Sequence, residues 1–253
     1  MSGGALLRIE GLEKRFGGLR ATDGLDLDVL PGELHALIGP NGAGKSTAIG
    51  QITGEIPPDA GRILFDGQDI TRLPPARRVR RGLSRSFQIV QLLDEETAEA
   101  NAALAVQAAQ GHSFRFWRDA TRDEGLRAPA RALLRRAGLP DARHGIPAGD
   151  LAAGERKQVE LALALAASPR LLLLDEPMAG LGASESRAMT ETLRGLKGQV
   201  AILLVEHDME AVFALADRIS VLVYGRVIAT GTAAEIRANA EVRAAYLAEE
   251  EGV

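Results

Sequence analysis

The chain contains no cysteine among its 253 residues. This absence excludes a disulfide framework, a thiolate metal site and a cysteine nucleophile together, and it fits an enzyme or binding module in a reducing compartment. An excess of positive charge is also missing, because 30 Lys and Arg residues stand against 34 Asp and Glu residues, a formal net charge of −4. A protein that binds nucleic acid by neutralising phosphates is normally basic, so this class of function is disfavoured.

Long apolar runs are missing as well. The most apolar stretches are Leu161–Ala167, Leu171–Leu174 and Ala201–Val205, and each is far shorter than the ~20 residues that a membrane-spanning helix needs. The first residues also lack the basic start and apolar run of a signal peptide. We therefore expect a soluble chain, and any membrane role must come through a partner.

The composition itself is that of a folded protein. Hydrophobic residues make up 46% and charged residues 25% of the chain, which argues against disorder, collagen and coiled coil. A chain of this length buries roughly 70–75% of its unfolded surface, enough for one large domain or two small ones.

The hydrophobic pattern predicts an α/β fold with an insertion. Two-fold alternation over residues 6–29 predicts antiparallel strands with one solvated face. Helical periodicity dominates from about Val90 to Ala167 instead. Apolar runs without alternation then predict central strands of a parallel sheet. The expected strands are Leu34–Ile38, Ile63–Phe65, Leu171–Leu174, Val200–Val205 and two around Tyr224-Gly225, and the expected helices begin near Lys45, Ala98, Pro129, Gly154, Ser184 and, after a capping box, Thr232.

A phosphate-binding loop is the most specific signal in the chain. Gly39-Pro-Asn-Gly-Ala-Gly-Lys-Ser46 fits the pattern G-x-x-x-x-G-K-[ST] between a predicted strand and a predicted helix. Its glycines let backbone N–H groups point at an anion, and the helix N-terminus adds a positive dipole end. We expect Lys45 to reach the β- and γ-phosphates and Ser46 to bind Mg²⁺. The predicted nucleotide-binding residues of this loop are Gly39, Pro40, Asn41, Gly42, Ala43, Gly44, Lys45, Ser46 and Thr47.

Three more polar side chains follow predicted strands, and a fourth lies at the start of the helical insertion. Asp175 can hold the metal through water, and Glu176 can take a proton from an attacking water. His207, after the strand at 200–205, faces the crevice where ligands bind and can contact the γ-phosphate. The amide of Gln88, at the junction with the helical insertion, can bind Mg²⁺ when the γ-phosphate is present. Each of these residues, taken alone, has an ordinary structural explanation, and it is the phosphate loop that favours the catalytic one.

The order of these motifs resembles the ATP-binding subunit of ABC transporters. The phosphate loop, Gln88, a helix opened by Leu151-Ala-Ala-Gly-Glu155, the Asp-Glu pair and the Glu-His-Asp run ending at Asp208 follow one another in this family's order. The resemblance implies a P-loop NTPase fold with a parallel sheet, an N-terminal antiparallel β subdomain and an inserted helical subdomain. Residues 1–253 then form a single ABC ATPase domain, with the nucleotide-binding core at 1–89 and 168–253 and the helical subdomain at 90–167.

Softer segments are similar to importers of branched-chain amino acids and related amide or urea compounds. These segments are Lys14-Arg-Phe-Gly-Gly-Leu19, Ser84-Arg-Ser-Phe-Gln88, Leu203-Leu-Val-Glu-His-Asp-Met209 and Val242-Arg-Ala-Ala-Tyr-Leu247. The resemblance therefore implies an ATPase that couples ATP binding and hydrolysis, with Mg²⁺, to uptake of such amino acids. Its implied partners are a second ABC ATPase subunit and a membrane permease, not nucleic acid, and its implied location is the cytoplasmic face of the inner membrane.

The family also implies two contacts that the residues alone do not show. Phe16 would stack on adenine, and a signature motif would contact the ATP that is bound by the partner ATPase. The signature residues are Leu151, Ala152, Ala153, Gly154 and Glu155. Physically, the N-terminus of the helix at 154–167 offers free N–H groups to a γ-phosphate.

This chain departs from the family pattern in the signature and in a nearby loop. Ala152 replaces the usual signature serine, Ala153 replaces a glycine, and Gly182 stands where Asp or Asn is usual. The missing hydroxyl and the missing polar link suggest the hypothesis that the chain works mainly in a heterodimer, with a sound phosphate loop and a weakened signature.

Other functions fit the sequence less well. A soluble ABC ATPase that acts on nucleic acid or ribosomes usually has two ATPase domains or a long coiled-coil insertion, and neither is evident here. A GTPase or small-molecule kinase is disfavoured because no Asn-Lys-x-Asp signal is present. Phe114-Arg-Phe-Trp117-Arg can be a nucleic-acid stacking patch, a helix with its aromatic face inward, or part of a groove that receives a permease helix.

Overall fold

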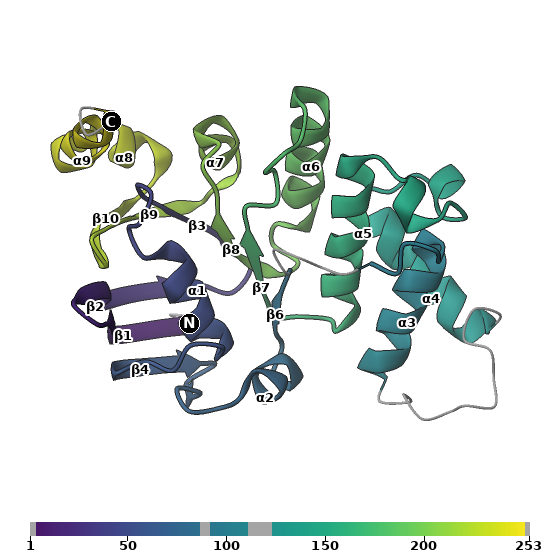
Figure 1. The fold of residues 1–253 in the computed structure, drawn as a ribbon, viewed down its shortest axis with the longest axis horizontal. Coiled ribbons are helices and arrows are strands. Elements are labelled where there is room, and N and C mark those ends of the chain that lie inside the picture. Colours follow the sequence, from purple (N-terminus) through teal and green to yellow (C-terminus); the bar gives the residue numbers. More distant parts are fainter. Residues whose placement is uncertain (1–3, 87–91, 111–122, 251–253) are drawn as a thin grey trace.

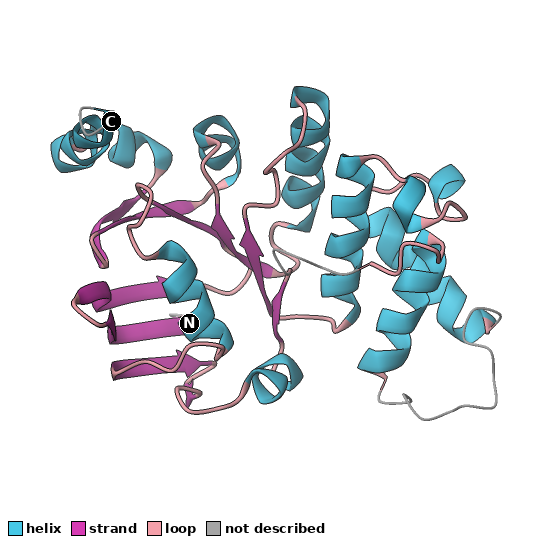
Figure 2. Ribbon diagram, in the orientation of Figure 1, coloured by secondary structure: helices cyan, strands magenta, loops and turns pink. Residues whose placement is uncertain are grey.

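The computed structural model describes residues 4–86, 92–110 and 123–250, and within them the chain forms two β-sheets with helices around and between them (Figures 1 and 2). Sheet A is antiparallel, with strand order β2-β1-β4-β5. Its strands are β1 (Leu7–Phe16), β2 (Leu19–Val29), β4 (Ala60–Phe65) and β5 (Gln68–Asp69). The predicted N-terminal antiparallel strands are confirmed.

Sheet B has six strands in the order β10-β9-β3-β8-β7-β6. They are β3 (Leu34–Ile38), β6 (Leu83–Arg85), β7 (Leu171–Asp175), β8 (Ala201–Val205), β9 (Arg218–Val223) and β10 (Arg226–Gly231). The five strands from β9 to β6 are parallel, and only the edge strand β10 is antiparallel to its neighbour. The predicted parallel arrangement of the central strands β7 and β8 is confirmed. Tyr224 and Gly225, both with positive φ, form the tight turn that requires this antiparallel pairing.

The described helices begin with α1, which lies between the two sheets (Figure 1). The helices are α1 (Lys45–Thr53), α2 (Pro75–Arg80), α3 (Ala98–Ala109), α4 (Glu124–Arg136), α5 (Ala153–Ala166), α6 (Ala183–Leu196), α7 (Met209–Leu215), α8 (Ala233–Ala238) and α9 (Ala240–Glu250), with short 3₁₀ turns at Asp141–Arg143 and Ala148–Asp150. Within these described ranges, none of the helices is long and apolar enough to cross a membrane.

Two hydrophobic cores explain why β7 shows no alternation. Leu171 and Leu173 pack with α1 and sheet A in one core. Leu172 and Leu174 point the other way, into a core formed with α3, α4, α5 and α6. Because successive strand residues face opposite sides, a sheet covered on both faces needs an apolar residue at every position. Both β7 and β8 are buried throughout, so the prediction of central strands is confirmed.

The predicted elements agree with the structure except at short or capped segments. The helix expected from Pro129 begins at Glu124 instead, because the side chain of Asp123 accepts a hydrogen bond from the Gly125 amide and caps an earlier turn. The sequence did not predict α2, β5, β6 and α7, which are short and therefore carry little periodic signal. The single helix expected after Thr232 is two helices, α8 and α9, because the Asn239 side chain caps a new helix start. The capping box at Thr232 and Glu235 is confirmed. The segment from Phe114 to Trp117 lies outside the described residues.

Candidate active site

The candidate site lies at the carboxyl edge of sheet B. Strands β3, β8 and β7 are adjacent and parallel, so the segments that follow them meet at one edge of the sheet. The phosphate loop follows β3, Asp175 ends β7 and is followed by Glu176, and His207 follows β8. Residues that are far apart in the sequence are thus brought together by strand order.

Two glycines of the phosphate loop are required by close backbone contacts. A Cβ atom on Gly39 would lie 2.0 Å from the Leu222 carbonyl oxygen, and one on Gly44 would lie 2.0 Å from the Ala21 carbonyl oxygen. Gly44 also has φ +106°, which side-chain-bearing residues rarely adopt. The loop therefore packs closely against β9 and β2.

The start of helix α1 carries positive character from its N-terminal N–H groups and from Lys45. Helix α1 has no acidic residue in its first turn, so its N-terminal N–H groups have no carboxylate of their own helix beside them. The buried Lys45 ammonium donates hydrogen bonds to the carbonyl oxygens of Gly39, at 2.5 Å, and Pro40, at 3.0 Å. Asn41, Gly42 and Ser46 are exposed. This arrangement suits the phosphates of a nucleotide.

Glu176 and His207 form a pair across the two strand ends. Glu176 Oε1 lies 3.0 Å from His207 Nε2, and the two side chains are 33% and 46% exposed, so water reaches both. Glu176 has φ +51°, an uncommon conformation for a residue with a side chain, and its amide donates to the Val205 carbonyl oxygen. Local backbone strain of this kind clusters at functional sites. The carboxylate can act as a base, with the imidazole beside it.

Glu206 holds the two strand ends together, a role that the sequence did not suggest. Its side chain is buried; Oε1 accepts a hydrogen bond from the Met178 amide at 2.8 Å, and Oε2 accepts one from the His207 amide at 3.0 Å. One carboxylate therefore fixes the segment after Glu176 and the backbone of His207. The feature of the sequence that could have indicated this role is the position of Glu206 directly after an apolar strand.

The oxygen atoms available at the site suit Mg²⁺ better than a metal ion whose ligands all come from the protein. No cluster of three or more His, Cys, Asp or Glu side chains suited to a metal occurs within residues 4–86, 92–110 and 123–250. The candidate donors are the exposed Ser46 hydroxyl and the buried Asp175 carboxylate. Mg²⁺ characteristically uses one or two protein oxygens and takes its remaining ligands from water and substrate phosphates. Gln88, the other predicted ligand, lies outside the described residues.

Asp175 has a cationic partner that the sequence did not predict. Its Oδ2 atom accepts a hydrogen bond from Arg85 Nη2 at 2.9 Å, and Arg85 Nη1 also donates to Glu55 Oε2 at 2.7 Å. Arg85 ends β6, the neighbour of β7.

Phe16 is placed on a hairpin that contacts the phosphate loop. Its ring is half exposed at the end of β1. Gln51 of α1 accepts a hydrogen bond from the Thr22 hydroxyl and donates to the Glu13 carbonyl oxygen, so the hairpin is held against the helix that follows the phosphate loop. Lys14 Nζ lies 5.6 Å from the centre of the Phe16 ring. The ring is accessible to a base.

The predicted signature residues begin α5, and the chain's own carboxylates occupy this helix end. Leu151 is buried, Ala152 and Ala153 are exposed, and Gly154 is buried. The Ala152 amide donates to Glu155 Oε2 at 2.9 Å, and the Gly154 amide donates to Glu185 Oε1 at 2.9 Å.

Each of these two carboxylates has further partners. Glu185 also accepts from the Gly182 amide, and the hydrogen bonds from Gly182 and Gly154 lower its pKa. Hydrogen bonds from Arg143, at 2.6 and 2.8 Å, lower the pKa of Glu155. Glu185, from α6, therefore holds the start of α5 to the start of its own helix.

Comparison with known proteins gives consistent results. The ABC transporter family model matches residues 22–179, and a model described as branched-chain amino acid ATP-binding cassette transporter matches residues 226–247. The high-affinity branched-chain amino acid transport ATP-binding protein LivG of Escherichia coli (strain K12) is 38% identical over 252 residues, covering 96% of this chain and 98% of that protein. The corresponding protein BraF of Pseudomonas aeruginosa is 36% identical, with the same coverage.

A solved structure supports the same assignment. The ADP conformation of MJ1267, an ATP-binding cassette of an ABC transporter, has a TM-score of 0.84 and 30% identity, and the match covers 96% of this chain and 99% of that one. The predicted fold class is confirmed, and the family and the ADP-bound neighbour support ATP as the nucleotide. The chain therefore belongs to the ABC transporter family, as one of its ATP-binding cassettes.

Proposed function

We propose that this chain is the ATP-hydrolysing subunit of an importer of branched-chain or related amino acids. Its support is the set of relatives named as branched-chain amino acid transport proteins, which match it over almost its whole length. The match at residues 226–247 points to the same group. The exposed Glu176–His207 pair at the strand edge that carries the phosphate loop is the observation on which the hydrolytic part depends.

Each site residue has a role in this proposal. The phosphate loop, residues 39–47, binds the phosphates, with Lys45 on the β- and γ-phosphates, and Phe16 stacks on adenine. Glu176 accepts the proton of the attacking water, and His207 orients that water or contacts the γ-phosphate. Ser46, Gln88 and, through water, Asp175 hold Mg²⁺, which neutralises charge on the phosphates.

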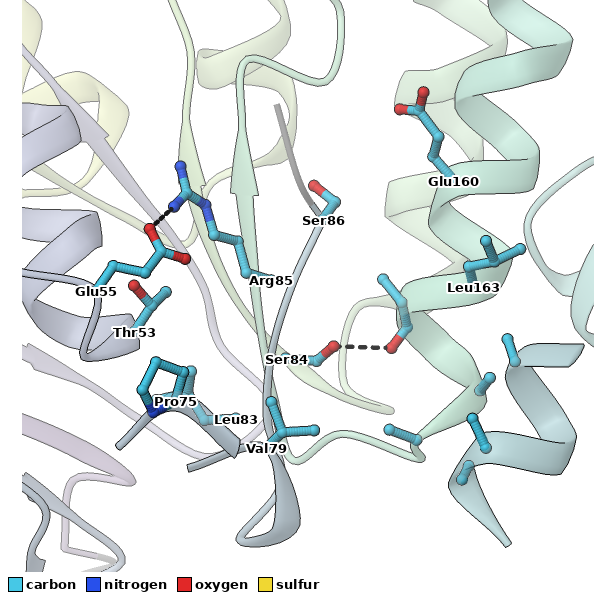
Figure 3. Close-up of a pocket in the computed structure, with 16 residues that line it drawn as sticks. Thr53, Glu55, Pro75, Val79, Leu83, Ser84, Arg85, Ser86, Glu160 and Leu163 are labelled. Carbon is cyan, nitrogen blue, oxygen red and sulfur yellow. Dashed lines mark hydrogen bonds and ion pairs between the residues drawn. The ribbon is translucent and has the colours of Figure 1, made fainter. Parts of the chain in front are cut away.

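The partners in this proposal are a membrane permease and a second ABC ATPase subunit at the cytoplasmic face of the inner membrane. Residues 151–155 contact the ATP of the second subunit, and residues 90–167 form the helical subdomain inserted between 1–89 and 168–253. A hollow of about 420 Å³ between α2, β6, α3 and α5, with a mainly apolar lining, is the surface on which we place a permease segment (Figure 3). Transport needs such a contact because hydrolysis must move a membrane protein.

The Glu176→Gln substitution tests the hydrolytic role. Removing a general base lowers rates by about 10²–10⁴-fold, so we expect ATP turnover by the assembled complex to fall by this factor. ATP affinity, measured by calorimetry, stays within about threefold because the phosphate loop is unchanged. Glu124→Gln, at a side chain on α4 that is 67% exposed, is the matched control. Turnover at the wild-type rate in Glu176→Gln would remove this residue from the mechanism.

The transport role is tested separately from hydrolysis. If the chain serves a permease, it co-purifies with membranes that contain its assembled complex, and the bound permease identifies the amino acid. Recovery with ribosomes or nucleic acid instead would favour the soluble ABC ATPase.

A further inference from the structure

Arg85 joins the candidate metal carboxylate to the wall of the hollow between α2, β6, α3 and α5. Its guanidinium donates from Nη1 to Glu55 and from Nη2 to Asp175. Glu55 follows α1, whereas Asp175 ends β7, so one side chain bridges two elements of the core. Figure 3 shows Arg85 and Glu55 together on one side of the hollow, with Glu160 of α5 on the other.

The Asp175 carboxylate depends on this arginine for its charge balance. Its side chain is 2% exposed, and Arg85 is itself only 13% exposed. A buried carboxylate without a cation or hydrogen-bond donors is costly. Among the ion pairs within the described residues, Arg85 is the partner of Asp175. The arginine therefore places a positive charge beside the carboxylate that we propose binds Mg²⁺ through water.

The position of the guanidinium is set by two opposing carboxylates. Glu55 is 42% exposed, and its carboxylate attracts the same guanidinium that donates to Asp175. The Nε atom of Arg85 is buried and has no hydrogen-bond partner among the described residues. A buried donor without a partner is unfavourable, so the bridge between the two acids holds the side chain in place against this cost.

We propose that Arg85 is a positioning residue that sets the magnesium requirement of nucleotide binding, by competing with the hydrated metal for Asp175. This inference rests on the proposed function of the site. Two cations that share one carboxylate weaken each other's binding. Glu55 counteracts this competition by holding part of the arginine's charge. A change in the charge of Glu55 therefore alters the affinity of the metal site for Mg²⁺.

The test measures the Mg²⁺ concentration that gives half-maximal binding of fluorescent ADP to the full chain. Arg85→Gln removes the competing charge and is expected to lower this concentration about three- to tenfold. Glu55→Gln releases Arg85 toward Asp175 and is expected to raise it about two- to threefold. Arg85→Lys keeps the charge and is expected to stay within about twofold of the wild type. Thermal unfolding without nucleotide verifies that each variant is folded.

The opposite signs of the two substitutions distinguish competition from simple support. If Arg85 only holds Asp175 in place, Arg85→Gln raises the magnesium requirement, and the proposal is wrong. Shifts of both variants in the same direction, or no shift in either, overturn it as well. If Arg85→Gln does not fold, the sign of the Glu55→Gln shift decides. Failure of the wild-type chain to bind ADP in excess Mg²⁺ would instead contradict the proposed function.

Discussion

Two helix N-termini in this protein have the same backbone chemistry and opposite electrostatics. Helix α1 begins with Lys45 and has no acid in its first turn. Helix α5 begins at Ala153, and its amides at Ala152 and Gly154 are already bound by Glu155 and Glu185. A helix end attracts an external anion more strongly where the chain places no carboxylate of its own on the first turn. Helix α1 is open to phosphate, and α5 is partly neutralised.

This difference gives the weakened-signature hypothesis a structural basis. Ala152 carries no hydroxyl at the exposed start of α5, and the nearest amides have carboxylate partners within the chain. An incoming γ-phosphate has to compete with two negative charges there. We therefore propose a heterodimer in which this chain contributes the stronger phosphate loop and the weaker signature.

Removing the cation at α1 is expected to have the largest effect. Lys45→Ala takes away the ammonium that is to bind the β- and γ-phosphates, and the loss of such charge-assisted hydrogen bonds lowers ATP affinity by about 100-fold. Calorimetry with MgATP measures it. Lys197→Ala, whose ammonium pairs with Asp217 outside the loop, is the control and keeps wild-type affinity. Equal affinities of the two variants would refute the role of Lys45.

The glycines at the two helix ends should differ in their tolerance of a methyl group. Gly44→Ala places Cβ 2.0 Å from a backbone oxygen at φ +106°, and we expect a loss of about 3 kcal/mol or more in unfolding free energy. Gly154→Ala meets the Glu185 side chain instead, with Oε1 at 2.8 Å and Cβ at 3.0 Å. The carboxylate can rotate away and the Cβ contact needs a shift of only a few tenths of an ångström, so the loss is about 1 kcal/mol. Urea unfolding compares them, and a larger loss for Gly154→Ala would contradict the argument.

Restoring a hydroxyl at α5 should strengthen the signature moderately. Ala152→Ser adds a donor for the partner's γ-phosphate, and we expect the ATPase rate of the assembled complex to rise about three- to tenfold. ATP binding by the isolated chain should not change, because its own phosphate loop is untouched. An unchanged rate in the complex would show that the signature is not weakened by the missing hydroxyl.

The smallest expected effect is on acid stability. Hydrogen bonds from Gly182 and Gly154 hold the pKa of Glu185 below its usual 4.5. The folded state is therefore favoured by this group above pH 4.5, and the benefit is lost as the pH falls through the lower folded pKa. Glu185→Gln should make the free energy of unfolding fall less steeply as the pH is lowered. The midpoint of acid unfolding should shift by about half a pH unit or less. Glu191→Gln on the same helix is the control, and identical curves for both variants would contradict the role of Glu185.

The sequence was most informative where the chemistry is local. The phosphate loop could be predicted because its N–H groups, glycines and lysine lie within eight consecutive residues, Gly39 to Ser46. The buried strands β7 and β8 could be predicted because their apolar runs have no polar face. Short elements such as β6 and α7 could not, since three to seven residues hold too little periodicity to identify a helix or strand.

Specific pairs of contacting side chains from distant segments could not be predicted. Arg85 and Asp175 are 90 positions apart and meet only because β6 pairs with β7. Glu185 and Gly154 are 31 positions apart. The Glu206 carboxylate accepts hydrogen bonds from two segments, which follow different strands. In each case the residue type gave no indication of its partner.

The sequence by itself determined the fold class, the nucleotide loop and the family, because hydrophobic period, glycine placement and motif order are properties of the linear chain. The tertiary structure alone decided which charges face each other: the acids at the start of α5, the Glu176–His207 pair, and the arginine between Glu55 and Asp175. The reason is physical. Electrostatic pairing depends on distance in space, and strand order and helix packing set that distance independently of separation along the chain.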